Sequence, residues 1–168
     1  MKLIIIGGGL AGCEAAWQAA KLGVDVMLYE MRPEKTTEAH KTDMLAELVC
    51  SNSLRSKEIT NGAGLLKKEL ETAGSLIMQA AAEWEVPAGS AFAVDRDKFA
   101  AHISNTIQQH PRITVIRQEI SSMPDSIAIL ATGPLTSMAM AGQLSKIIGA
   151  EHLYFYDAIA PIIDAESI

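Results

Sequence analysis

Apolar and polar positions in the first 30 residues predict a strand, a helix and a second strand. Residues 3–6 form a continuous apolar run rich in β-branched side chains, which is typical of a buried parallel strand. Small residues recur through 10–22 and predict a helix that can lie close to a sheet, with Gly23 ending it. The alternating segment 24–29 predicts a second strand that ends at Glu30. Together these segments predict a βαβ unit.

The rest of the chain continues the alternation of strands and helices. Residues 32–56 show no clear period, so we expect a loop with a short helix near 44–49, and the longest helical pattern follows at 65–84. The later elements expected are strands at 91–94, 113–120 and 127–130, helices at 96–109 (N-cap Asp95) and 136–148, a turn at 133–134, and apolar segments at 153–156 and 159–163. This order predicts an α/β fold with a parallel sheet and an insertion after the second strand, at approximately 32–94.

Composition and charge narrow the class of protein. A chain of 168 residues with 49% hydrophobic and 20% charged residues suits one packed globular domain, or one and a fraction. The net charge of −6 argues against nucleic-acid binding over the whole surface. Seven of the 14 basic residues lie within 32–68, which leaves open a local basic surface or ordinary solvated charge.

Cysteine, histidine and apolar spacing exclude several kinds of site. The two cysteines form no CxxC pair and the four histidines are scattered, so we expect neither a disulfide scaffold nor a metal site. The apolar run at 3–6 is too short for a signal peptide, and no stretch reaches the roughly 20 apolar residues of a membrane span. We therefore expect a soluble, cytoplasmic protein that binds no metal and no membrane.

The segment after the first strand fits the GxGxxG pattern of dinucleotide-binding folds. It comprises Gly7, Gly8, Gly9, Leu10, Ala11 and Gly12. In that pattern Gly7 allows the tight turn, Gly9 lets the backbone approach a pyrophosphate, and Gly12 lets the helix pack on the strand. The helix N-terminus attracts the phosphates, and Glu30 can accept hydrogen bonds from ribose hydroxyls. A carboxylate at Glu30 would repel a 2′-phosphate, so NADP is disfavoured at this site.

Two further features favour FAD over NAD as the dinucleotide. Arg32 follows the acidic residue at the end of the second strand. The apolar run at 127–130 leads into Ala131, Thr132 and Gly133, which resembles the second signature of flavoproteins built on two dinucleotide-binding folds. We predict that Glu30, Arg32 and these three small residues contact FAD together with the glycine-rich segment.

Several other segments together resemble the folate- and FAD-dependent tRNA (uracil-5-)-methyltransferases. They are residues 39–43 (AHKTD), 47–53 (ELVCSNS), 64–70 (GLLKKEL), 86–89 (VPAG), 93–96 (AVDR), 131–137 (ATGPLTS) and 154–161 (YFYDAIAP). The resemblance covers essentially the whole chain, and its most specific segments lie around Cys50 and after Ala131.

The resemblance implies a reaction and its cofactors. Methylenetetrahydrofolate would supply a one-carbon unit to C5 of the T-loop uridine of tRNA, reduced FAD would reduce it to a methyl group, and NAD(P)H would re-reduce the flavin. The partners implied are tRNA and folate. Two alternatives stay open: a wobble-uridine tRNA-modifying flavoprotein, which shares the first glycine motif, and a non-catalytic nucleotide-binding fragment.

Members of this family are far longer than 168 residues. The resemblance therefore implies that residues 1–168 are the amino-terminal part of a truncated FAD-binding domain and are inactive alone. Cys50, which lies near the cations Arg55 and Lys57 in the sequence, is a candidate catalytic thiol near the flavin or the uracil. These cations would favour a reactive thiolate, and the alternative is a buried structural cysteine. We expect Cys13, in the first helix, to pack in the core.

Overall fold

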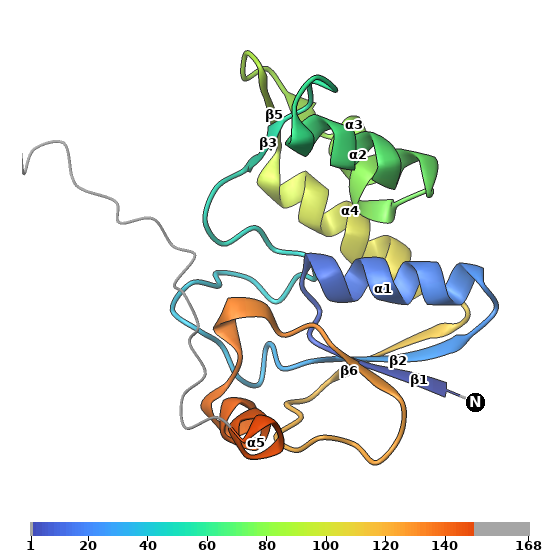
Figure 1. Cartoon of the computed structure of the whole chain (residues 1–168), viewed down its shortest axis with the longest axis vertical. Coiled ribbons are helices and arrows are strands. Elements are labelled where there is room, and N and C mark those ends of the chain that lie inside the picture. The colour runs from blue at the N-terminus through green and yellow to red at the C-terminus, as the bar shows by residue number, and fades with distance from the viewer. Residues whose placement is uncertain (1, 150–168) are drawn as a thin grey trace, which may run out of the picture.

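Four parallel strands form the main sheet of the computed structural model, which describes residues 2–149 (Figure 1). They are β1 (Lys2–Ile6), β2 (Asp25–Glu30), β6 (Ile113–Arg117) and β7 (Ala128–Leu130), in the spatial order β6-β2-β1-β7. In register, Ile5 of β1 pairs with Leu28 on one side and Ile129 on the other. The predicted α/β fold with a parallel sheet is confirmed.

A second, antiparallel sheet lies between β2 and β6 in the sequence. It contains β3 (Ser53–Ser56), β4 (Glu85–Val86) and β5 (Ala91–Val94) in the order β3-β5-β4. Helices α2 (Gly62–Thr72) and α3 (Leu76–Glu83) connect β3 to β4. We call β3, α2, α3, β4 and β5 the inserted unit, and Figure 1 shows it above the parallel sheet.

Three α-helices and one 3₁₀ helix complete the part of the chain that the structure describes. Helices α1 (Leu10–Lys21) and α4 (Arg96–Gln109) cover one face of the parallel sheet, and α3 packs on both of them. After β7, a short 3₁₀ helix η1 (Gly133–Leu135) leads to α5 (Met138–Ile148), which lies below the sheet in Figure 1. No helix among residues 2–149 is long and apolar enough to cross a membrane.

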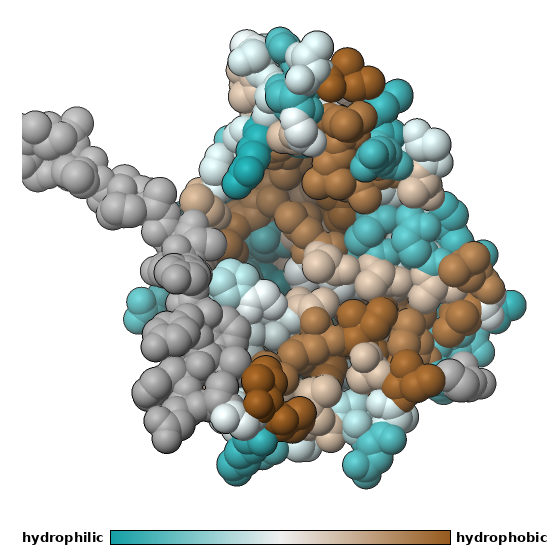
Figure 2. Space-filling model, viewed as in Figure 1, coloured by the Kyte–Doolittle hydropathy of each residue, from teal (hydrophilic) through white to brown (hydrophobic). Residues whose placement is uncertain are grey.

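Large apolar side chains are exposed near β7, which is an edge strand of the parallel sheet, and at the start of α5. Ile127 is 63% exposed, and Met138 at the start of α5 is 88% exposed. Figure 2 shows apolar residues gathered along the lower part of the molecule, where β7 and α5 lie in Figure 1. Contiguous apolar surface of this kind is typical of a face that contacts another protein segment.

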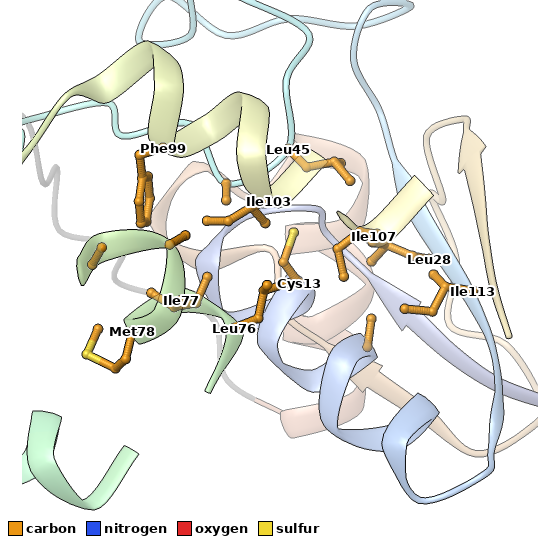
Figure 3. Close-up of a cluster of buried hydrophobic side chains, with 14 of the residues drawn as sticks. Cys13, Leu28, Leu45, Leu76, Ile77, Met78, Phe99, Ile103, Ile107 and Ile113 are labelled. Carbon is orange, nitrogen blue, oxygen red and sulfur yellow. The ribbon is translucent and has the colours of Figure 1, made fainter. Parts of the chain in front are cut away.

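The main core lies between the sheet, α1, α3 and α4. Phe99, Ile103 and Ile107 project from α4 toward α1 and α3, where they meet Leu76 and the fully buried Cys13 (Figure 3). The helix α4 begins after Asp95, as predicted, because the Asp95 side chain accepts a hydrogen bond from the Lys98 N–H. Such a cap satisfies one of the backbone donors that every helix start leaves free.

The outer face of α1 binds the turn between α2 and α3. The Trp17 indole N–H donates to the Gly74 carbonyl at 3.1 Å. The carboxylate of Glu14 accepts from the Ser75 hydroxyl at 2.8 Å and from the Ile77 N–H at 3.1 Å. A carboxylate at the start of α3 also complements the positive end of that helix. Helix α1 therefore joins the inserted unit to the parallel sheet.

The predicted single helix at 65–84 is wrong, because the structure has two helices there. Gly74 adopts a positive φ of 69°, which ends the helical path after α2. Ser75 then caps the new helix by accepting from the Met78 N–H.

The predicted short helix at 44–49 is also wrong, since this segment forms turns. Ala46 has a φ of 54°, and its N–H donates to the carbonyl of Gly8 instead of to a helical neighbour. The strand expected at 113–120 ends at Arg117. The apolar segments expected at 153–156 and 159–163 lie outside the described residues.

Candidate dinucleotide-binding site

A cavity of about 290 Å³ lies where β1, β2 and β7 end. Ten residues predicted from the sequence line it: Gly7, Gly8, Gly9, Leu10, Ala11, Glu30, Arg32, Ala131, Thr132 and Gly133. Five others complete the lining: His40, Glu47, Val49, Pro134 and Leu135. The structure therefore brings together the first glycine motif and the Ala-Thr-Gly segment, which are more than 100 positions apart. Gly12 and Cys50, which were also predicted as site residues, are not among its lining residues.

Two glycines are required by close backbone packing under the cavity. Gly7 has a φ of 107°, and a Cβ there would lie 2.5 Å from the carbonyl oxygen of Ala131. That approach is fixed because the Ala131 N–H donates to the carbonyl of Ile6 at 2.8 Å. A Cβ on Gly12 would overlap the carbonyl oxygen of Gly7. Both positions therefore exclude any side chain.

Gly9 differs from these two glycines because a Cβ there would meet no atom within 4 Å. Gly9 is the N-cap of α1 and offers no side chain to cap the helix. The first N–H groups of a helix lack partners within that helix, and they carry its partial positive charge. Open space in front of such donors fits a pyrophosphate group. The residues present therefore fit the dinucleotide that the sequence predicts.

Gly8 packs against the loop that follows β2. A Cβ on Gly8 would lie 2.6 Å from Leu45 Cδ2 and 2.7 Å from Glu30 Oε2. The Gly8 carbonyl accepts from the Ala46 N–H at 2.8 Å. Leu45 is itself fixed to α4, because its N–H donates to the Ser104 hydroxyl at 2.8 Å. This loop is therefore joined to both the glycine-rich segment and α4.

Glu30 is buried at the end of β2 and is held from two sides. Its Oε2 accepts from the Gly8 N–H at 2.9 Å, while its Oε1 accepts from the Arg32 N–H at 3.0 Å and from Arg32 Nε at 2.8 Å. Burial by itself raises the pKa of a carboxyl group. The hydrogen bonds and charge of Arg32, with the Gly8 N–H, outweigh burial and hold the pKa of Glu30 below its ordinary value. Glu30 is therefore an anion at neutral pH.

Arg32 is 1% exposed and lies between two carboxylates. Besides its contact with Glu30, its Nη1 donates to Glu47 Oε2 at 2.8 Å. Glu47 also accepts from the Lys41 N–H at 2.8 Å and from the Thr42 hydroxyl at 3.0 Å. A buried guanidinium needs such partners, because an unpaired buried charge is strongly destabilising. The three side chains together carry one net negative charge.

His40 borders the cavity from the same loop. Its Nδ1 lies 2.7 Å from the Thr37 hydroxyl. Burial, followed by the positive charge of Arg32, lowers the pKa of His40 below its ordinary value. The imidazole is therefore neutral at pH 7 and can offer its second nitrogen to a ligand.

Cys50 is exposed, which rules out the alternative of a buried structural cysteine. Its neighbour in the sequence, Val49, lines the cavity. The Cys50 carbonyl accepts from the Arg96 guanidinium at 3.5 Å. Lys57, one of the cations expected to favour the thiolate, pairs instead with Glu85.

Cys13 lies in the core, as expected, beneath the glycine-rich segment. Its thiol donates to the carbonyl of Gly8 at 3.3 Å. Burial and then the negative charge of Glu30 raise the pKa of Cys13 to about 12. The thiol is therefore protonated and unreactive at neutral pH.

Sequence reasoning missed the contributions of His40, Glu47 and Val49 to the cavity. All three lie in the unpatterned loop at 32–56, where no periodicity indicates which side chains point inward. One signal was available, since a buried arginine beside an acidic strand end requires a second acidic partner. Glu47 is one of several acids in the loop that could have met that requirement.

A parallel sheet whose first strand turns through glycines into a helix, with an acid ending the second strand, defines a dinucleotide-binding protein of the Rossmann class. The family model described as "Glucose inhibited division protein A" matches residues 2–168. The chain belongs to this family.

Named relatives of this chain are similar to it over nearly its whole length. The Sulfurihydrogenibium sp. protein named methylenetetrahydrofolate--tRNA-(uracil-5-)-methyltransferase TrmFO is 56% identical over 100% of this chain and 39% of its own length. The Moorella thermoacetica protein of the same name is 61% identical over 99% of this chain and 38% of its own length. The chain thus spans less than two fifths of these relatives.

Among solved structures, GidA of Aquifex aeolicus matches with a TM-score of 0.60 at 14% identity, covering 74% of this chain and 20% of that one. At this identity the match is informative for the fold alone, and it agrees with the Rossmann class.

Proposed function

We propose that this chain is the amino-terminal part of a FAD- and methylenetetrahydrofolate-dependent tRNA (uracil-5-)-methyltransferase. The observation that supports this most directly is the 53–61% identity, over nearly the whole chain, to relatives that carry this name. In this proposal residues 1–168 begin the FAD-binding domain, and approximately 32–94 are its insertion. The protein acts in the cytoplasm, on tRNA and folate.

The chain's own residues bind and orient the adenosine half of FAD. The N-terminus of α1 binds the pyrophosphate at Gly9, and Glu30 accepts a hydrogen bond from a ribose hydroxyl. The turn from Ala131 to Gly133 lets the backbone lie close to the cofactor. When bound, FAD supplies the electrons that reduce the transferred one-carbon unit to a methyl group, and NAD(P)H restores them.

The first experiment assays the intact protein, of which this chain is the amino-terminal part. Methylenetetrahydrofolate, FAD and NADH are added to transcripts that contain either a T-loop or a wobble uridine. We expect a methyl group at C5 of the T-loop uridine. Modification of the wobble uridine alone would favour the alternative flavoprotein, and no flavin in the purified protein would favour a non-catalytic nucleotide-binding protein.

The cofactor site is tested by Gly9→Val in the same protein. The new side chain projects into open space of the cavity, where the pyrophosphate would lie, so bound flavin should be lost while circular dichroism stays unchanged. A full flavin spectrum in a folded Gly9→Val protein would show that the cavity does not bind the dinucleotide.

Cys50 is proposed to lie near the flavin or the uracil during catalysis. Its exposed thiol should react more slowly with a thiol reagent when FAD is bound, and Cys50→Ala should reduce turnover. Equal labelling rates with and without FAD, together with normal turnover of Cys50→Ala, would remove Cys50 from the active site.

Residues 1–168 expressed alone should retain FAD weakly, transfer no methyl group and associate. The chain supplies the adenosine side of the site, and the exposed apolar side chains around β7 and α5 favour association. Methyl transfer above background by this piece would overturn the view that the activity needs the longer protein.

A further inference from the structure

Six basic residues lie between the start of β3 and the first turn of α4, and they fall into two groups. Three lysines form ion pairs with an acid: Lys57 with Glu85, Lys68 with Glu71, and Lys98 with Asp95. The other three, Arg55, Lys67 and Arg96, form no ion pair with the residues that the structure describes. In a chain with a net charge of −6, unpaired cations gathered in one region favour an anionic partner.

The three unpaired cations follow β3 from its start to its end. Just before the strand, Arg96 Nη2 donates to the carbonyl of Cys50 at 3.5 Å. At its end, Lys67 Nζ donates to the carbonyl of Ser56 at 3.1 Å, and Arg55 lies on the strand between these two points. The segment from residue 50 to residue 56 spans at most about 20 Å. We call Arg96, Arg55 and Lys67 the cationic row.

Arg55 occupies a β-bulge, where glycine adopts the required conformation most easily. Between the register pairs Ser53–Ala93 and Ser56–Ala91, β3 has one residue more than β5, and Arg55 has a φ of 67°. Its backbone N–H donates to the Ser53 hydroxyl, whereas its exposed guanidinium has no acceptor among the described residues. The backbone conformation therefore does not account for an arginine here, and the bulge instead presents the guanidinium to solvent.

Lys67 is held beside Arg55 by the two elements that it joins. Its ammonium group donates to the carbonyls of Ser56 in β3 and Ala63 in α2, which leaves one N–H group without an acceptor in the described part of the chain. Partial burial, followed by the charge of Arg55, lowers the pKa of Lys67. A phosphate beside two cations that repel each other would relieve that repulsion and accept hydrogen bonds from both.

We propose that the cationic row binds the phosphate backbone of the tRNA strand whose uridine is modified beside Cys50. This rests on the proposed tRNA-modifying function and names a part of the surface that contacts the substrate. A row of up to about 20 Å exceeds a single phosphate and suits a nucleic-acid strand, which carries one charge at each nucleotide. Contacts of this kind position the strand and carry no sequence information, so other groups select the uridine.

The experiment measures the affinity of the intact protein for a T-loop tRNA transcript over a series of KCl concentrations. At low salt, Arg55→Gln should bind the transcript about tenfold more weakly, because a charge-assisted contact is lost. The slope of log affinity against log salt concentration should become shallower by about 0.7 to 0.9, since one phosphate is no longer neutralised. The flavin content should stay unchanged, because Arg55 does not line the cavity.

The paired lysines are matched controls for the cationic row. Lys57→Gln and Lys68→Gln remove the same charge from side chains that an acid already engages, so the salt slope should not change. Lys67→Gln should act as Arg55→Gln does. Because Lys67 also joins β3 to α2, Arg55→Gln carries the test if Lys67→Gln fails to fold.

Two results would overturn the proposal. One is an equal salt slope in Arg55→Gln and Lys57→Gln. The other is a lower affinity of Arg55→Gln for methylenetetrahydrofolate with an unchanged affinity for tRNA, which would show that the cationic row binds the carboxylates of the folate.

Failure of the proposed function is distinguishable from failure of this inference. If the intact protein methylates the T-loop uridine but Arg55→Gln keeps the original salt slope, the function stands and the role of the cationic row is wrong. If the intact protein neither binds nor methylates the transcript, the proposed function is wrong, and the role of the cationic row is wrong with it.

Discussion

The parallel-sheet unit and the inserted unit depend on different kinds of contact. At the glycine-rich turn, backbone atoms of β1, α1 and the segment after β7 approach so closely that Gly7 and Gly12 have no room for a Cβ. The inserted unit instead meets α1 through apolar packing of α3 and through hydrogen bonds that Glu14 accepts and Trp17 donates. A single methyl group should therefore disrupt the first unit, whereas the second should respond to the loss of polar side chains.

The largest effect is expected from Gly12→Ala. The added Cβ would overlap the carbonyl oxygen of Gly7, so the variant should lose more than about 4 kcal/mol of stability or fail to fold. Gly9→Ala is the matched control, since nothing lies within 4 Å of its Cβ, and should change stability by less than about 1 kcal/mol. Urea denaturation measures both, and equal stability of the two variants would refute the steric argument.

Removing the carboxylate that holds the inserted unit should have an intermediate effect. Glu14→Ala leaves the Ser75 hydroxyl and the Ile77 N–H without their acceptor, at a cost of about 1–3 kcal/mol. Hydrogen exchange should accelerate at the start of α3 more than in β2. Glu71→Ala, on the exposed side of α2, is the control, and a similar exchange pattern in both variants would exclude a specific role for Glu14.

Acidification should lower the stability of the folded chain, because Glu30 then becomes protonated. The pKa of Glu30 is lower in the folded chain than its ordinary value of 4.5. The stabilisation from the ionised carboxylate is therefore complete above about pH 4.5, and it is lost as the pH falls through the lower pKa of the folded chain. Glu30→Gln should therefore flatten the loss of stability below about pH 4.5, although Asp95, whose pKa is also lowered, keeps part of it. The free energy of unfolding is measured at pH 7 and pH 3, with Glu34→Gln as the control. If Glu30→Gln lost as much stability between these pH values as the original protein, the prediction would be contradicted.

The smallest effect is expected at the surface pair of Lys35 and Glu119. Their charged groups lie 2.9 Å apart, but the lysine side chain is half exposed. Exposed pairs contribute about 0–1 kcal/mol and are screened by salt. Lys35→Ala should thus cost under about 0.5 kcal/mol in 0.5 M NaCl. A larger loss would indicate that this pair joins the segments that follow β2 and β6 more firmly than its exposure suggests.

The sequence predicted the parallel-sheet unit well because each of its elements is specified locally. The apolar run of β1, the small residues of α1 and the cap at Asp95 each indicate one structure without reference to distant residues. The break between α2 and α3 was also specified locally, by Gly74 followed by Ser75, but the apolar periodicity on both sides obscured it.

The cavity could be predicted where a sequence signature of dinucleotide-binding folds marks its lining residues. Gly7, Gly9 and Glu30 follow from the demands of a dinucleotide, whereas His40 and Glu47 reach the cavity because their loop folds back onto Gly8. Ala46 has a high intrinsic helix propensity, but its backbone adopts a positive φ because its N–H bonds to Gly8. No local sequence pattern indicates this contact.

The two thiols differ in exposure, and this difference allows a probe to be attached selectively to the folded chain. Cys13 is sealed in the core as a thiol with a pKa of about 12, so within this chain a maleimide dye or a spin label will attach at Cys50 without any engineered cysteine. The label would lie beside Val49, at the edge of the cavity. Its fluorescence or its nitroxide spectrum would then follow the filling of that cavity in real time.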